Sequence, residues 1–199
     1  MRLADLPVPS TPVAQIARAV VAEFSPPALV NHCERSYLFA TSLAASRGIE
    51  IDHELLYVAT MLHDLALEQQ FDNATLPFEV AGGFVASIFG AGAGWSPDRR
   101  ARAGAIVVDH MRDDTDPAVD PEGYLLALAT SLDISGYQPA AWPTELLAEI
   151  VAVHPRLDLG DLFIARFTGQ AERKPKCAAA ASVRSGIADR IRANPLEKL

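Results

Sequence analysis

The sequence is organised around one stretch, Leu55-Leu56-Tyr57-Val58-Ala59-Thr60-Met61-Leu62-His63-Asp64-Leu65-Ala66-Leu67. It contains no proline or glycine, and most of its residues are good helix formers. A helix that is apolar on nearly every side is a buried one, so we expect His63 and Asp64 inside the protein. Burying an imidazole beside a carboxylate costs free energy unless each group finds a partner. A divalent metal ion is a partner that serves both groups.

Length and composition limit the class of protein. The chain has 199 residues, half of them apolar, which predicts a folded protein with a sizeable core. A formal net charge of -8 argues against nucleic acid or an anionic membrane as the main partner. A small-molecule substrate and a homo-oligomer both stay open. The two cysteines, Cys33 and Cys177, are too far apart in the sequence to indicate a disulfide framework or a thiolate metal site.

Two further features of the sequence concern its location. The first residues show no signal-peptide h-region, and no apolar run reaches the roughly 18–20 residues that a membrane span needs. Together with the lack of a disulfide pattern, these features predict a cytoplasmic protein.

Periodicity and capping residues predict an all-α fold, a multi-helix bundle without strands of convincing length. We expect helices over residues 12–24, 28–46, 53–70, 78–89, 97–111, 122–134, 144–153, 158–170 and 177–191. Residues 90–94 are expected to form a flexible connector and residues 112–121 an acidic surface loop. We predict one domain over residues 1–199, with a core at about 25–135 and a C-terminal helical extension at about 144–192.

Four polar residues in the predicted helices are the candidate metal ligands: His32, His63, Asp64 and Asp133. Imidazole nitrogens and carboxylate oxygens suit one divalent ion, with zinc favoured and iron, manganese or nickel as alternatives. In an octahedral shell, four protein ligands leave positions for water or substrate. A water bound there, with its pKa lowered towards about 7, is a nucleophile at neutral pH.

The order H…HD…D across an all-α chain resembles the HD-domain superfamily of metal-dependent hydrolases. Within residues 25–135, four stretches look like its cyanamide-hydratase-like branch: Asn31-His32-Cys33-Glu34-Arg35-Ser36-Tyr37, Glu54-Leu55-Leu56-Tyr57-Val58-Ala59, Met61-Leu62-His63-Asp64-Leu65 and Phe78-Glu79-Val80. The resemblance implies a single metal ion held by His32, His63, Asp64 and Asp133. It also implies water addition to a small nitrile-like substrate such as cyanamide. This chain has Ala66 where the branch favours glycine and Ala81 where the branch usually has aspartate.

Four other residues are candidates for catalytic roles. His110, at a predicted helix end, either orients the substrate or moves a proton beside the metal, or it is a histidine favoured by the helix dipole. Arg35 either holds an anionic substrate, pairs with a ligand carboxylate or forms an ordinary interhelix salt bridge. Glu68 is a candidate general base, although its position where the helix leaves the core favours an exposed side chain. Glu79 is either catalytic or a favourable charge at a helix start.

Three functions follow as hypotheses. The first is a metal-dependent hydrolase or hydratase that adds water to a small, uncharged, nitrile-like molecule. The second is a phosphohydrolase acting on a nucleotide or another phosphoester, which requires basic residues near the metal. Apart from Arg35, the sequence places no Lys or Arg beside the ligand positions. The third is a binding protein in which the metal is a structural staple.

Overall fold

The computed structural model describes residues 1–112 and 114–199, and every regular element within them is helical. The all-α prediction is therefore confirmed. The α-helices are α1 (Pro12–Phe24), α2 (Pro27–Arg47), α3 (His53–Leu62), α4 (Phe78–Gly92), α5 (Pro97–Asp109), α6 (Pro121–Ser135), α7 (Thr144–Val153), α8 (Leu159–Arg173), α9 (Ala178–Arg184) and α10 (Ile187–Arg192). The short 3-10 turns are η1 (Leu3–Asp5), η2 (Leu65–Leu67), η3 (Pro139–Ala141) and η4 (Pro195–Lys198).

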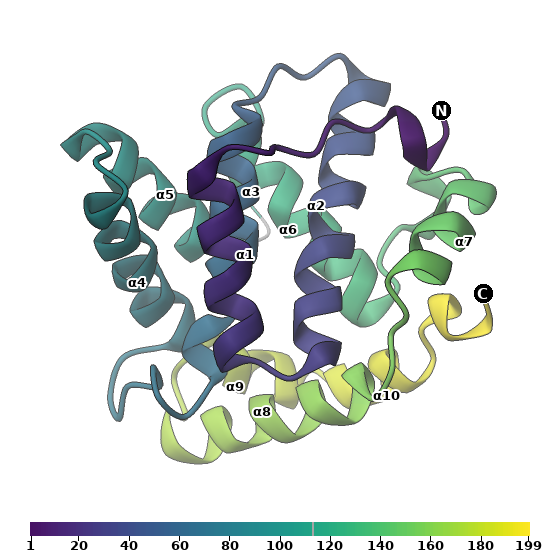
Figure 1. The fold of residues 1–199 in the computed structure, drawn as a ribbon. Helices are drawn as coiled ribbons and strands as arrows, with labels where there is room; N and C mark the ends of the chain where they lie inside the picture. The colour runs from purple at the N-terminus through teal and green to yellow at the C-terminus, as the bar shows by residue number, and fades with distance from the viewer. Residues whose placement is uncertain (113) are drawn as a thin grey trace.

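Helix α2 is the central helix of the bundle (Figure 1). Its residues from His32 to Ala44 are all buried, because α1, α3, α6, α7 and α8 pack around it. The helix ends at Gly48, whose left-handed backbone (φ 63°) most residues adopt only at a cost. Because α2 is surrounded by protein, its polar side chains must find their partners inside the fold.

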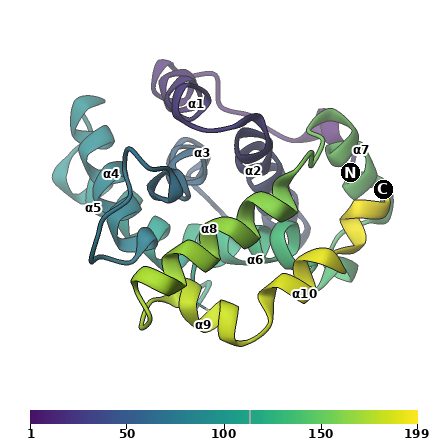
Figure 2. The same ribbon diagram turned by 90° about the horizontal axis from the view of Figure 1, so that it is seen from below.

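Two groups of apolar side chains form the interior. The larger group lies mainly among α1 to α7, and the smaller joins the start of α2, η2 and the start of α4 to α8, α9 and α10. Figure 2 shows α8, α9 and α10 together on one side of the bundle, beside α6. Helix α2 contributes Cys33 to the larger group and Leu29 to the smaller, with His32 between them in the sequence.

Helices α4 and α5 pack backbone to backbone at a pair of glycines. A Cβ atom on Gly83 would lie 2.9 Å from the carbonyl oxygen of Gly104, and a Cβ on Gly104 would lie 2.9 Å from that of Gly83. Only residues without a side chain allow this approach. It places His110, just after α5, beside Phe78 at the start of α4, with ring centroids 5.8 Å apart.

The helix expected over residues 53–70 is shorter than predicted. Helix α3 ends at Leu62, His63 is its C-terminal cap, and the 3-10 turn η2 follows Asp64. The physical reason lies in His63, whose Nδ1 donates a hydrogen bond to the carbonyl oxygen of Thr60 at 2.6 Å. A continuing α-helix would use that carbonyl for the N–H of Asp64, so the side chain competes with the next helical turn.

Other boundaries also differ from expectation. The helix expected over residues 177–191 is divided into α9 and α10 at Gly186, whose φ of 77° breaks the helix. The expected connector at 90–94 is partly helical, since α4 continues to Gly92. In the acidic loop Asp120 is buried, because it caps α6 by accepting from the N–H of Gly123 at 2.6 Å. Asp113 lies outside the described residues.

In the part of the chain that the structure describes, no helix combines the length and apolarity needed to cross a bilayer. The cytoplasmic location stays a prediction.

Candidate metal centre and its cavity

The side chains of His32, His63 and Asp64 converge inside the protein. The Nε2 atom of His32 lies 3.2 Å from Nε2 of His63 and 3.4 Å from Oδ2 of Asp64. The remaining pair, His63 Nε2 and Asp64 Oδ2, is 3.0 Å apart. Ligand atoms at roughly 2.0–2.2 Å from a zinc ion are separated by about these distances, so the three atoms fit one face of a coordination shell. They form a buried group that could hold a metal ion.

Hydrogen bonds at the opposite ring nitrogens orient the two imidazoles. His63 Nδ1 donates to the carbonyl of Thr60, and His32 Nδ1 donates to Oδ2 of Asp133 at 2.6 Å. A carbonyl or carboxylate oxygen only accepts, so the proton in each case is on Nδ1. Each Nε2 is therefore the atom available for a metal, in the arrangement typical of metal-bound histidines.

Asp133 lies on the other side of the His32 ring from the three converging atoms. Its Oδ1 accepts from Arg35 Nε at 2.9 Å and from Arg156 Nη1 at 2.8 Å. Its Oδ2 accepts from Arg35 Nη2 at 2.8 Å as well as from His32. The structure thus brings three of the four predicted ligands together and places the fourth, Asp133, behind His32 with both oxygens already hydrogen-bonded.

The two buried carboxyl groups are held ionised by different means. Burial acts to raise the pKa of Asp133, but Arg35, His32 and Arg156 together hold that pKa well below its usual range. Burial also acts to raise the pKa of Asp64, which His63 and His32 lower well below its usual range. In turn, burial lowers and Asp64 raises the pKa of His63, and the net effect is a pKa well above the ordinary histidine value. Without a metal, the raised pKa of His63 therefore favours a protonated imidazole that forms an ion pair with Asp64.

His110 lies at the edge of the same group. Its Nε2 is 3.8 Å from Oδ1 of Asp64, and its ring packs edge-on against His63 with centroids 4.9 Å apart. Its Nδ1 donates to the carbonyl of Val107, so the Nε2 lone pair faces Asp64. Burial, with the nearby His63, lowers the pKa of His110 to about 4, and the ring is neutral at pH 7.

The other three predicted residues are buried but stand back from the cluster. Arg35 forms its ion pair with Asp133, as one of the expected alternatives had it. Glu68 is buried rather than exposed, because Arg166 pairs with its Oε2 at 2.8 Å. Glu79 is also buried, and its Oε2 has no hydrogen-bond partner among the described residues. Burial raises the pKa of both glutamates.

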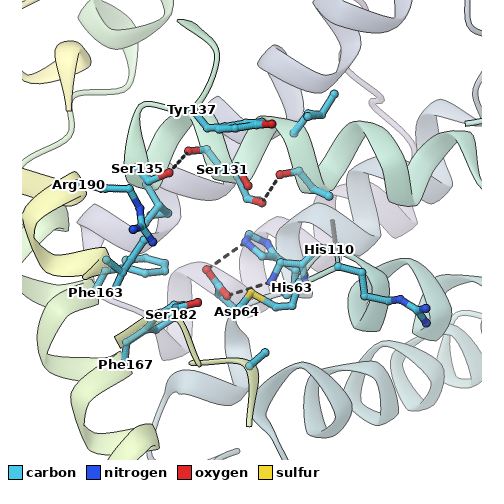
Figure 3. A pocket seen from close by; sticks show the side chains of 18 of the residues that line it. His63, Asp64, His110, Ser131, Ser135, Tyr137, Phe163, Phe167, Ser182 and Arg190 are labelled. Carbon is cyan, nitrogen blue, oxygen red and sulfur yellow. Dashed lines mark hydrogen bonds and ion pairs between the residues drawn. The ribbon is translucent and has the colours of Figure 1, made fainter. Parts of the chain in front are cut away.

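A cavity of about 660 Å³ opens onto the cluster. His32, His63, Asp64 and His110 line one part of it, and the other walls come from α6, α8, α9 and α10 and from Met111 and Arg112 after α5 (Figure 3). Arg35, Glu68 and Glu79 are absent from the described residues that line it. The cavity thus gives a small molecule access to the three candidate ligands and to His110.

Sequence reasoning missed the residues that the C-terminal helices bring to the site. Phe163, Phe167 and Arg190 line the cavity, and Arg156 contacts Asp133. The spacing of Phe163 and Phe167, one helical turn apart, is a signal for a shared face. No local pattern marks the two arginines, because their roles depend on where α8 and α10 fold back onto α2 and α6.

The fold and the site define a class of protein: an all-helical bundle with a buried His-His-Asp group that could hold a metal ion beside an accessible cavity. The chain is 25% identical to cyanamide hydratase DDI2 of Saccharomyces cerevisiae over 177 aligned residues. The alignment covers 86% of this chain and 78% of the yeast protein. Cyanamide hydratase DDI3 of the same yeast matches with the same values. No family model matches the chain. This distant similarity supports the interpretation of the chain as a hydratase.

Proposed function

We propose that this protein is a metal-dependent hydratase that adds water to a small nitrile-like molecule such as cyanamide. The observation that carries the proposal is the triangle of ligand atoms from His32, His63 and Asp64, with sides of 3.0–3.4 Å, facing a cavity. The similarity to two yeast cyanamide hydratases supports the reaction type. One ion is proposed, with zinc favoured over iron, manganese or nickel for two nitrogens and a carboxylate oxygen.

His32, His63 and Asp64 would hold the ion directly. We assign Asp133 to positioning His32, since its oxygens are occupied by Arg35, Arg156 and the His32 Nδ1. A carboxylate behind a metal-bound histidine fixes the ring orientation and typically changes metal affinity about 10–100-fold when removed. Arg35 is proposed to act through Asp133 in the same way, without contacting the substrate.

The chain's own contribution to the chemistry is proton handling. When bound, a divalent cation supplies Lewis-acid activation of water and of the nitrile. Hydration forms a bond between the water oxygen and the nitrile carbon, and both water protons end on the former nitrile nitrogen. His110 presents a neutral Nε2 lone pair beside Asp64, so it is placed to take a proton from water and return it to nitrogen. Glu68 and Glu79, outside the cavity lining, are given no step.

Two alternative functions are a phosphohydrolase and a binding protein with a purely structural metal. A phosphohydrolase is favoured by Arg190 and Arg112, which line the cavity, whereas Arg35 was the one basic residue expected beside the ligand positions. Arg112 pairs with Asp109 and Asp114, so among the described lining residues Arg190 is left as a single unpaired positive charge for a phosphate. A purely structural metal is disfavoured, because all three candidate ligands line a cavity large enough for a ligand.

The test is metal analysis of the purified protein combined with a panel of cyanamide, simple nitriles and phosphoesters. We expect about one divalent ion per chain and conversion of cyanamide to urea that a chelator abolishes and added zinc restores. The variant Asp64→Asn should lose turnover, whereas Asp161→Asn, on α8 and outside the lining, should retain it. Turnover of phosphoesters but not of cyanamide or nitriles would contradict the hydratase proposal and support a phosphohydrolase.

A further inference from the structure

The cavity is much larger than cyanamide. Its volume of about 660 Å³ is in the range of roughly 300–1,000 Å³ that drug-sized ligands occupy. Cyanamide, with only three non-hydrogen atoms, would leave most of this space to solvent. The size indicates a substrate with a body as well as a reactive nitrile.

The wall next to the cluster is aromatic. The Phe163 ring meets His32 edge-on with centroids 5.2 Å apart, and the centroids of Phe163 and Phe167 are 5.6 Å apart. Both rings line the cavity, together with Ile134 of α6. Such a wall binds an apolar body, preferably a flat ring that can pack against aromatic faces and edges.

Arg190 of α10 gives the same cavity a positive charge. Figure 3 shows its side chain entering from α10 on the same side as Phe163. Two of its nitrogens donate to Ser185, Nη1 to the carbonyl at 2.6 Å and Nη2 to Oγ at 3.1 Å, which holds the guanidinium in place. No carboxylate of the described residues pairs with it, whereas Arg112 on the same lining pairs with Asp109 and Asp114. The remaining Arg190 donors are open to a ligand.

Building on the hydratase function, we propose that the cavity takes organic nitriles that carry an apolar, ring-sized body and a carboxylate. The nitrile lies at the cluster, the body lies against Phe163 and Phe167, and the carboxylate accepts hydrogen bonds from Arg190. One guanidinium matches the single charge of a carboxylate better than the roughly −1.5 to −2 of a phosphate monoester. The reaction is balanced hydration: water adds across the carbon–nitrogen triple bond, giving a primary amide and no other product.

The test compares 4-cyanobenzoate with benzonitrile, which differ only in the carboxylate, and with cyanamide. In zinc-loaded protein we expect kcat/KM to follow the order 4-cyanobenzoate, benzonitrile, cyanamide. Arg190→Met should lower the ratio of kcat/KM for 4-cyanobenzoate over benzonitrile by up to about tenfold, mainly through KM, as expected for one charge-assisted contact from an exposed arginine. Arg192→Met is the matched control, since Arg192 is on the same helix and outside the lining, and it should keep the wild-type ratio.

Binding of 4-cyanobenzoate, measured by NMR titration, separates this inference from the hydratase proposal. Turnover of cyanamide with equal or better kcat/KM than 4-cyanobenzoate would overturn the substrate class and leave the hydratase standing. An unchanged selectivity ratio in Arg190→Met would equally overturn it. A third outcome is tighter binding of 4-cyanobenzoate than of benzonitrile, with the difference lost in Arg190→Met, but no turnover of any nitrile. This result would support the carboxylate-binding site and contradict the proposed hydratase activity.

Discussion

The two sides of the His32 ring present two buried carboxylates in different states. On one side, Asp133 is surrounded by Arg35, Arg156 and the His32 Nδ1, and both of its oxygens accept hydrogen bonds. On the other side, the partners of Asp64 among the described residues are the Nε2 atoms of two imidazoles and, farther off, that of His110. The first carboxylate has fixed cationic partners. The second has partners whose charge depends on a proton.

This difference separates a structural ion pair from a site prepared for a ligand. An arginine stays protonated at every accessible pH, so its charge cannot be exchanged for another cation. A proton on His63 can be displaced by a divalent ion, and metal binding to histidine releases protons in this way. We therefore expect the side of Asp64 to respond to metal and pH, and the side of Asp133 to respond mainly to mutation.

The largest expected effect comes from removing a ligand on the exchangeable side. His63→Ala should weaken zinc binding by about a thousandfold, or about 4 kcal/mol, because a ligand contributes more than the 10–100-fold of an outer partner. Isothermal titration with a competing chelator measures the affinity. His154→Ala removes a half-buried histidine outside the cluster and should bind zinc as the wild type does. Equal zinc affinities in the two variants would contradict the assignment of His63 as a metal ligand.

The next prediction compares the two carboxylates directly in metal-free protein. Asp133→Asn should lower the free energy of unfolding by about 3 kcal/mol, because two buried arginines lose their charged partner and cannot deprotonate. Asp64→Asn should cost about 1 kcal/mol or less, because His63 can release its proton when the carboxylate is gone. Urea unfolding in the presence of a chelator measures both. Equal losses would show that Asp64 belongs to an ordinary buried ion pair.

How much of this site can be predicted from the sequence depends on how far apart in the chain the interacting residues lie. The apolar run around His63 and Asp64 and the capping residues Thr11 and Asp52 act locally, so the starts of α1 and α3 follow from the sequence, whereas the early end of α3 at Leu62 does not. The convergence of His32 with His63 was expected from the order of the motif. The placement of Asp133 behind His32 was not, because it depends on Arg156, which the chain brings back only after α7. Local patterns carry no information about such a return.

The third prediction concerns pH and the exchangeable proton. The folded pKa of His63 is raised above its unfolded value of about 6.5, so its stabilising effect is complete below that pH and is lost as pH rises through the folded pKa. Metal-free protein should lose up to about 1.4 kcal/mol of stability per pH unit in this window, while zinc affinity rises up to about tenfold per unit. Thermal unfolding and zinc titration across neutral to alkaline pH measure these slopes.

The control for the pH prediction is His63→Gln, which cannot take up the proton. Its stability should be nearly flat over the same window, whereas Asp133→Asn should be lower than wild type with a similar slope. Wild-type and His63→Gln curves that run parallel would contradict the assignment of the proton to His63.

The smallest expected effect tests whether the fixed side depends on the C-terminal segment. Asn194, just before η4, is buried and donates through Nδ2 to the carbonyl of Asp133 at 2.8 Å and to that of Leu132 at 3.3 Å. Asn194→Ala should lower stability by about 1 kcal/mol, the usual contribution of such hydrogen bonds. Because these bonds hold the backbone of Asp133 rather than its carboxylate, zinc affinity should fall less than in Asp133→Asn. A loss of zinc affinity as large as that of Asp133→Asn, with stability unchanged, would instead place Asn194 in the control of the metal site itself.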